Sequence, residues 1–85
     1  MHEIVLSAPA ERDLKPLPAP AFPRVIAAIR ALAATPRPPG CRKLHSTDHD
    51  DYRIRVGDHR VVYEVDDPAR ILRIMRIRHR REVYR

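Results

Sequence analysis

The chain from residue 52 to its C-terminus alternates apolar residues with arginines over three strand-length stretches. Successive side chains of a strand point to opposite faces of a sheet, so this alternation predicts one apolar face and one basic face. Three strands are expected, at Tyr52–Val56, His59–Val65 and Ile71–Ile77. The turn-forming sequences Gly57-Asp58 and Asp66-Asp67-Pro68 separate them. The second half of the chain therefore predicts an antiparallel meander.

The first half of the chain predicts a short strand followed by two helices. Ile4–Leu6 is an apolar run that predicts the strand, and Ser7 is placed to cap a helix that has Pro9 in its first turn. Prolines 16, 18 and 20 end this helix, and a second helix is expected from about Pro20 to Ala34. Its expected buried stripe follows helical spacing and consists of Phe22, Val25, Ile26, Ile29, Leu32 and Ala33.

The order of these elements predicts the fold class. The proline-rich stretch Thr35–Gly40 is expected to be a stiff connection, and Leu44 is expected to begin a short strand before a polar loop over residues 45–51. The resulting order is β-α-α-β-β-β. It predicts an α+β fold in which two N-terminal helices pack on one face of a small, mostly antiparallel twisted sheet. The 85 residues, 44% of them hydrophobic, are expected to form a single domain over residues 1–85.

Cysteine content and the N-terminus indicate where the protein works. Cys41 is the sole cysteine, so no internal disulfide is possible and a reducing compartment is expected. The N-terminal fifteen residues contain only a three-residue apolar run and no basic stretch, so neither a signal peptide nor a membrane span is expected. Both features favour the cytoplasm.

Positive charge is concentrated in the predicted meander. Residues 52–85 contain ten arginines and five acidic residues, whereas residues 1–51 carry a charge of about +1. A guanidinium stays protonated at physiological pH and presents forked donors that match phosphate oxygens. A basic sheet face of this kind predicts a polyanionic partner, with nucleic acid as the first candidate and a solvated face as the alternative.

No metal or other cofactor is expected. The loop before the meander is rich in metal-ligand residue types, namely His45, Asp48, His49, Asp50 and Asp51. These residues lack the fixed helical or strand spacing that typifies a metal site. Cys41 beside Arg42 is interpreted as an inert thiol, because no histidine or aspartate is placed by the sequence to activate it.

Several motifs in order resemble the RelE/ParE superfamily of toxins from toxin–antitoxin systems. They are a short first strand, PAERDLKPLP, the linker before Cys41-Arg-Lys-Leu44, YRIRVGDHRVVYEVDD and RIRHRREVYR. The resemblance covers nearly the whole chain and is strongest to the RelE branch. It implies a toxin that cleaves mRNA in the decoding site of the ribosome and that a small cognate antitoxin neutralises by wrapping its surface. Operator DNA would be bound only through the toxin–antitoxin complex.

The resemblance also implies a set of functional residues. The catalytic positions would be Arg55, Arg60, Arg78, His79 and Tyr84, and the RNA-binding positions would be Arg53, Arg76, Arg80 and Arg81. In this family the 2′-hydroxyl of the RNA attacks the adjacent phosphate, so fixed guanidinium groups suit the developing negative charge. Arg55 and Arg60 would clamp the scissile phosphate, and Arg78 would lie near the leaving 5′-oxygen. Tyr84 would stack on a base or assist proton transfer.

One departure from the family pattern concerns the general base. Many relatives have lysines where this chain has Arg53 and Arg55, and arginine is poorly suited to proton abstraction because its pKa exceeds ~12. Imidazole titrates near neutrality, so His79 is considered for this role beside Tyr84. The ribosome is a further source of part of the chemistry.

Two other functions remain open. A ParE-like toxin inhibits DNA gyrase by binding, with no phosphate chemistry, and a degenerate toxin binds only its antitoxin and operator DNA. The combination of Arg60, Arg78 and Tyr84 with His79 favours the nuclease.

Overall fold

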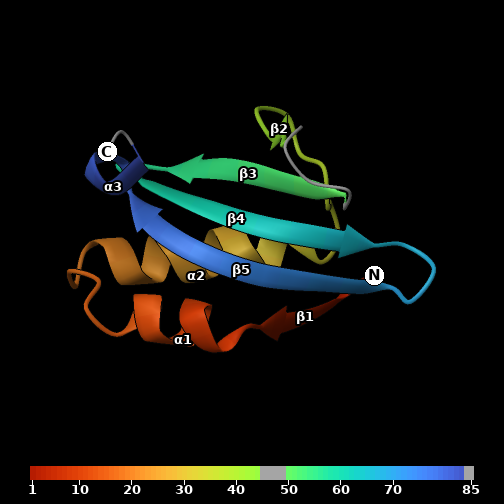
Figure 1. Cartoon of the computed structure of the whole chain (residues 1–85), viewed down its shortest axis with the longest axis horizontal. Coiled ribbons are helices and arrows are strands. Elements are labelled where there is room, and N and C mark those ends of the chain that lie inside the picture. Colours follow the sequence, from red (N-terminus) through yellow and green to blue (C-terminus); the bar gives the residue numbers. More distant parts are fainter. Residues whose placement is uncertain (45–49, 84–85) are drawn as a thin grey trace.

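One five-stranded sheet runs through the molecule, and two helices cover one of its faces (Figure 1). The computed structural model describes residues 1–44 and 50–83. Its elements are β1 (Glu3–Leu6), α1 (Ala8–Leu14), α2 (Ala21–Leu32), β2 (Arg42–Lys43), β3 (Asp51–Val56), β4 (His59–Asp66), β5 (Ile71–His79) and α3 (Arg80–Val83). The strand order is β1-β5-β4-β3-β2, in which β1 and β5 are parallel and the other neighbours are antiparallel. The predicted α+β fold is confirmed.

Two strand boundaries differ from the prediction by two residues. The expected short strand at Leu44 lies slightly earlier, at Arg42–Lys43. β5 continues two residues beyond Ile77, because Arg78 and His79 still pair with the start of β4. The four-residue helix α3, which was not predicted, follows directly. Most of the predicted polar loop, residues 45–49, lies outside the described residues.

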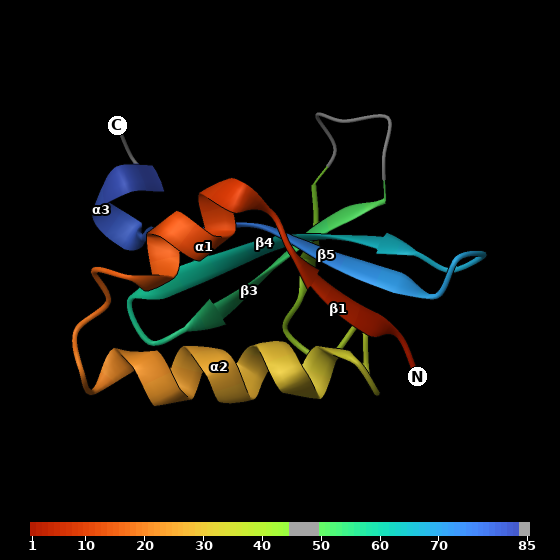
Figure 2. The ribbon, with the colours of Figure 1, turned by 90° about the horizontal axis from the view of Figure 1, so that it is seen from below.

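The two long helices cover different strands of the same sheet face. The Ser7 hydroxyl accepts a hydrogen bond from the Ala10 N–H at 3.2 Å and so caps α1 as predicted. α1 packs beside β5, whereas α2 runs along β3 and β4 (Figure 2). α2 buries Val25, Ile29 and Leu32. No helix within the described ranges is long and apolar enough to cross a bilayer.

Phe22 was wrongly predicted to belong to the buried stripe of α2. It is 44% exposed and lies in the first turn of the helix. Together with Ile26 it lines a shallow apolar groove on the outer side of α2. Helical spacing alone placed Phe22 near the stripe, but Phe22 lies with Ile26 on the outer side of α2.

Beyond the end of β1, Ser7 and Asp13 form hydrogen bonds with the backbone of β5. The Ser7 N–H donates to the Ile74 carbonyl at 3.0 Å, and the Ser7 hydroxyl donates to the Met75 carbonyl at 2.9 Å. Further along, the Asp13 carboxylate accepts the Ile77 N–H at 2.9 Å. Ser7 and Asp13 thus pair backbone groups at this edge of β5, which fixes the position of α1 relative to β5.

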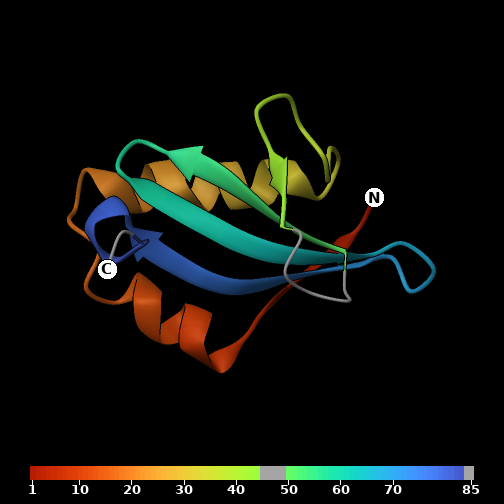
Figure 3. The same cartoon turned by 45° about the horizontal axis from the view of Figure 1, so that its top comes forward.

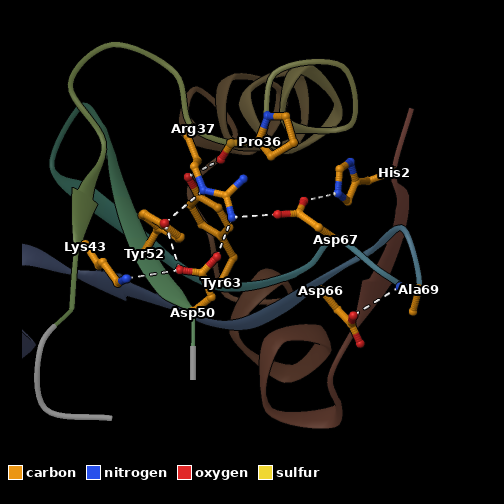
Figure 4. A network of polar contacts seen from close by, with 10 residues as sticks. All are labelled: His2, Pro36, Arg37, Lys43, Asp50, Tyr52, Tyr63, Asp66, Asp67 and Ala69. Atoms are coloured by element: carbon orange, nitrogen blue, oxygen red, sulfur yellow. Dashed lines mark hydrogen bonds and ion pairs between the residues drawn. The ribbon is translucent and has the colours of Figure 1, made fainter. Parts of the chain in front are cut away.

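A polar network ties the proline-rich connection to the end of the sheet far from α3 (Figure 4). Arg37 donates to the Tyr52 hydroxyl at 2.8 Å, to Asp67 at 3.0 Å and to Asp50. These hydrogen bonds, led by the one with Tyr52, raise the pKa of Arg37. The buried Tyr63 donates its hydroxyl hydrogen to the Pro36 carbonyl at 2.7 Å. The connection is therefore fixed in place, in agreement with the predicted stiffness.

Candidate nucleic-acid interface

Three arginines form a row across the sheet face that the helices leave uncovered. Figure 3 shows the sheet from this side, with the helices behind it. Arg55 on β3 lies directly opposite Arg60 on β4, and Arg60 lies directly opposite Arg78 on β5. Neighbouring strands are about 4.8 Å apart, so the three side chains start from adjacent positions on one face. Arg60, in the centre, is only 8% exposed, whereas Arg55 is exposed. We call these three residues the arginine row.

A bulge in β5 brings Arg78 into this row. Leu72 and Ile74 are buried against the helices, and simple alternation would place Arg78 on that same face. The pairing of β4 with β5 shifts between Val62 and Tyr63, which leaves Met75 as an extra residue on β5. Beyond the bulge Ile77 is buried and Arg78 lies on the uncovered face.

A cleft of about 390 Å³ lies beside the arginine row, between the β3–β4 turn and α3. It is lined by Arg55, Gly57, Asp58, His59, Arg60, Arg80 and Arg81. α3 is attached to the turn because the Arg80 N–H donates to the Asp58 carbonyl at 2.7 Å. The Arg80 guanidinium also lies 3.8 Å from the Asp58 carboxylate. Four arginines thus line a space in which a phosphate fits, which suits electrostatic stabilisation of phosphate charge.

The predicted site residues divide into those near the cleft and those elsewhere. Arg55, Arg60, Arg80 and Arg81 line the cleft, and Arg78 is adjacent to Arg60. Arg53 shares the face of Arg55 but lies two residues further from the turn, opposite Val62. Tyr84 lies outside the described residues.

His79 lies on the other side of the sheet from the arginine row. It is the partner of His59 in the β4–β5 ladder, and the two rings meet edge to face with centroids 5.2 Å apart. His79 lines hollows beneath the connection between α1 and α2, together with Pro18. The structure therefore does not bring His79 and the arginine row together. His59, which was not among the predicted site residues, lines both these hollows and the arginine cleft.

Arg76 contacts α1 and is not among the residues that line the cleft. Its guanidinium donates to the Asp13 carboxylate at 2.8 Å and 3.3 Å. Burial alone would raise the pKa of Asp13, but the hydrogen bonds from Arg76 and from the Ile77 N–H, with the nearby charge of Arg78, lower it below its usual value. Asp13 is thus a charged anchor between α1 and β5. The sequence contained no signal for this pair, which is 63 residues apart.

Removing this anchor should destabilise the fold in a pH-dependent way. Asp13→Asn is expected to lower the free energy of unfolding at pH 7 by about 1–2 kcal/mol, a modest value because Arg76 is partly exposed. The pKa of Asp13 is lower in the folded chain, so its contribution is present above the usual aspartate range and is lost as pH falls through the folded value. Urea unfolding at pH 7 and pH 3 should show the difference from wild type shrinking in acid.

Glu11→Gln is the matched control for this experiment. Glu11 is an exposed acidic residue on the same helix, and its change should cost less than about 0.5 kcal/mol. An Asp13→Asn penalty that is equally large at both pH values would show that the carboxylate charge is not what stabilises the α1–β5 contact.

Comparisons with known proteins agree on one family and one fold. The family described as the ParE toxin of type II toxin-antitoxin system, parDE, matches residues 4–84. Among curated proteins, none matches this chain significantly in sequence. Three solved structures illustrate the similarity of fold.

The first is archaeal RelE in the RelE–RelB complex from Pyrococcus horikoshii OT3, with a TM-score of 0.82 and 26% identity over 93% of this chain and 94% of that chain. The second is the isolated RelE toxin of E. coli, with a TM-score of 0.80 and 20% identity over 99% and 92%. The third is the RelBE2 toxin–antitoxin complex from Mycobacterium tuberculosis, with a TM-score of 0.71 and 26% identity over 92% and 96%.

Proposed function

The chain belongs to the ParE toxin family of type II toxin–antitoxin systems, and on this premise we propose that it is an endoribonuclease toxin that cleaves mRNA held by the ribosome. The observation that carries the proposal is the arginine row beside a cleft lined by four arginines. Binding of a partner protein alone would not require a buried, centrally placed Arg60. Such a group would stabilise a phosphate that gains negative charge during a reaction. Because the proposed substrate is mRNA on the ribosome, the proposed location of the protein is the cytoplasm.

The proposed reaction is a transfer of the phosphate within the RNA strand. The 2′-oxygen forms a bond to the adjacent phosphorus while the bond from phosphorus to the 5′-oxygen of the next nucleotide breaks. The products are a 2′,3′-cyclic phosphate and a free 5′-hydroxyl. One proton leaves the 2′-hydroxyl and another reaches the leaving oxygen. Arg55 and Arg60 clamp the phosphate, and Arg78 stabilises the charge on the leaving oxygen from the neighbouring position.

Proton transfer is assigned to His59 in place of His79. The residues that line the arginine cleft include two titratable residues other than arginine, Asp58 and His59. Imidazole is the group whose charge changes between about pH 5 and pH 8, as a proton-transfer group requires. His79 lines the hollows under the helices, whereas His59 lines those hollows and also the arginine cleft. The ribosome and Tyr84 supply the remaining proton transfer.

A small antitoxin is the proposed protein partner. The similar structures from Pyrococcus horikoshii and Mycobacterium tuberculosis are both toxin–antitoxin complexes. This chain carries a net charge of +6, and its basic face is uncovered, so an acidic segment of the antitoxin would complement it. Binding to operator DNA would occur through that complex.

Inhibition of DNA gyrase is the second candidate function. It is favoured by the family match, because the family description is that of ParE toxins rather than of RelE toxins. In this case the arginine row would form part of a protein interface, and no RNA would be cleaved.

Controlled expression of the toxin separates the two functions. On the nuclease proposal, growth and translation should stop within minutes, and primer extension should reveal new mRNA 5′-ends within coding regions. Arg60→Ala, expressed at the same level, should abolish these ends. Intact mRNA together with gyrase-linked DNA breaks would overturn the nuclease proposal and establish the gyrase function.

RNA binding should depend strongly on salt. If a bound strand places about four of its phosphates against the basic sheet face and the cleft, affinity for single-stranded RNA should fall by about 50-fold between 50 mM and 200 mM salt, because bound counterions are released. Fluorescence anisotropy with a short labelled RNA measures this slope. Arg55→Ala should make the slope shallower by about one phosphate, whereas a slope near zero would mean that the cleft does not bind the RNA backbone.

A further inference from the structure

α3 is held by the side chain of the residue that precedes it. His79 is the last residue of β5, and its Nδ1 atom accepts the N–H of Arg81, the second residue of α3, at 3.1 Å. This is the hydrogen bond that a serine or asparagine makes when it caps a helix N-terminus. A ring nitrogen that accepts a hydrogen bond carries no proton, so the cap requires neutral imidazole with its hydrogen on Nε2.

We propose that His79 is a positioning residue that makes the arginine cleft sensitive to pH. Neutral His79 caps α3 and so holds Arg81 beside the cleft. Protonated His79 has a donor at Nδ1 that faces the Arg81 N–H, and the cap is lost. The consequence for RNA rests on the proposed function, but the change in α3 itself does not.

The surroundings of His79 favour this response. Charged and titratable groups from the adjoining elements are Asp13 on α1, Arg24 on α2, Asp58 in the turn, His59 on β4, and Arg80 and Arg81 on α3. Asp13 is bonded to Arg76, and Asp58 lies beside Arg80, so both nearby carboxylates already have a cationic partner. A charged His79 would therefore add to a locally positive region. Hollows of about 340 and 260 Å³ leave the ring accessible to solvent protons.

The direction of the pH effect follows from proton binding. The uncapped state binds one more proton at His79 than the capped state, so the capped fraction rises with pH across the range in which imidazole titrates. Loss of a helix cap changes the equilibrium between formed and unformed helix by about fivefold. The attachment of Arg80 to the Asp58 carbonyl does not titrate, and it keeps α3 near the turn in both states.

Nuclear magnetic resonance of the full chain tests the proposal directly. The imidazole nitrogen shifts of His79 report its tautomer, and the backbone Cα shifts of residues 80–83 report the helix population between pH 5.5 and pH 8. We expect the Nε2–H tautomer at pH 8 and a helix equilibrium about fivefold weaker at pH 5.5. An Nδ1–H tautomer, or Cα shifts that do not change with pH, would overturn the proposal.

Three variants separate capping from other roles of His79. Asparagine caps a helix but does not titrate, so His79→Asn should keep α3 formed at every pH, whereas His79→Ala should weaken it at every pH. His59→Phe retains an aromatic ring against His79 and should keep the wild-type pH dependence. Equal behaviour of His79→Asn and His79→Ala, or loss of the pH dependence in His59→Phe, would contradict the proposal. These measurements do not use RNA, so they stand even if the nuclease function fails.

Discussion

Replacing Arg60 by alanine is expected to lower the rate of mRNA cleavage on programmed ribosomes by about 10²-fold or more. Arg60 lies between Arg55 and Arg78 in the arginine row and is largely buried, so its guanidinium is held in place before the substrate binds. A preorganised charge that meets developing negative charge contributes on this scale. The rate must be measured at saturating toxin, so that weaker binding is not mistaken for lost chemistry.

Matched variants make the result at Arg60 specific. Arg60→Lys should restore only part of the rate, because a point charge does not reproduce the forked donors of arginine. Arg30→Ala removes the same charge from an exposed position on α2 and should leave the rate unchanged. A urea unfolding midpoint like that of wild type shows that each variant is folded. If Arg60→Ala and Arg78→Ala are folded and fully toxic, the phosphate clamp is wrong and gyrase inhibition becomes the better proposal.

Most of the fold was predictable because local signals and the global pattern agree. The Ser7 cap with Pro9, the prolines between the helices and the Gly57-Asp58 turn each mark a boundary that the structure confirms. α3 was not predictable in this way. It is four residues long, has no apolar periodicity, and depends on contacts with the β3–β4 turn and with His79.

The site could be predicted only in part, because strand register and tertiary packing decide which side chains share a face of the sheet. Arg55 and Arg60 could be placed on one face from alternation and the hairpin turn. The position of Arg78 depends on the bulge at Met75, which reverses the faces of every residue that follows it on β5. The same reversal places His79 on the helix side of the sheet. His79 is therefore not beside the arginine row, where the proton-transfer role considered for it would require it to be.

His59→Phe is expected to have the second large effect. Loss of a general acid or base lowers rates by about 10²–10⁴-fold, and in a His79→Asn background, where the α3 cap does not titrate, the limb of the pH–rate profile near neutrality should disappear with it. Phenylalanine preserves the edge-to-face contact with the ring of His79, so α3 should keep its position while the titratable nitrogens are removed. Cleavage rates on programmed ribosomes between pH 5.5 and pH 8.5 measure both effects.

A second histidine at the opposite end of the molecule serves as the control for His59. His2 is bonded to Asp67 at 2.9 Å in the network around Arg37, far from the cleft, and His2→Ala should change neither the rate nor its pH profile (Figure 4). Should His59→Phe lower the rate but leave the pH limb in place, His59 would help to bind RNA without moving a proton. The limb would then belong to another group, and a ribosomal group or Tyr84 would have to take up the proton of the 2′-hydroxyl, because the arginines of the cleft remain charged across this pH range.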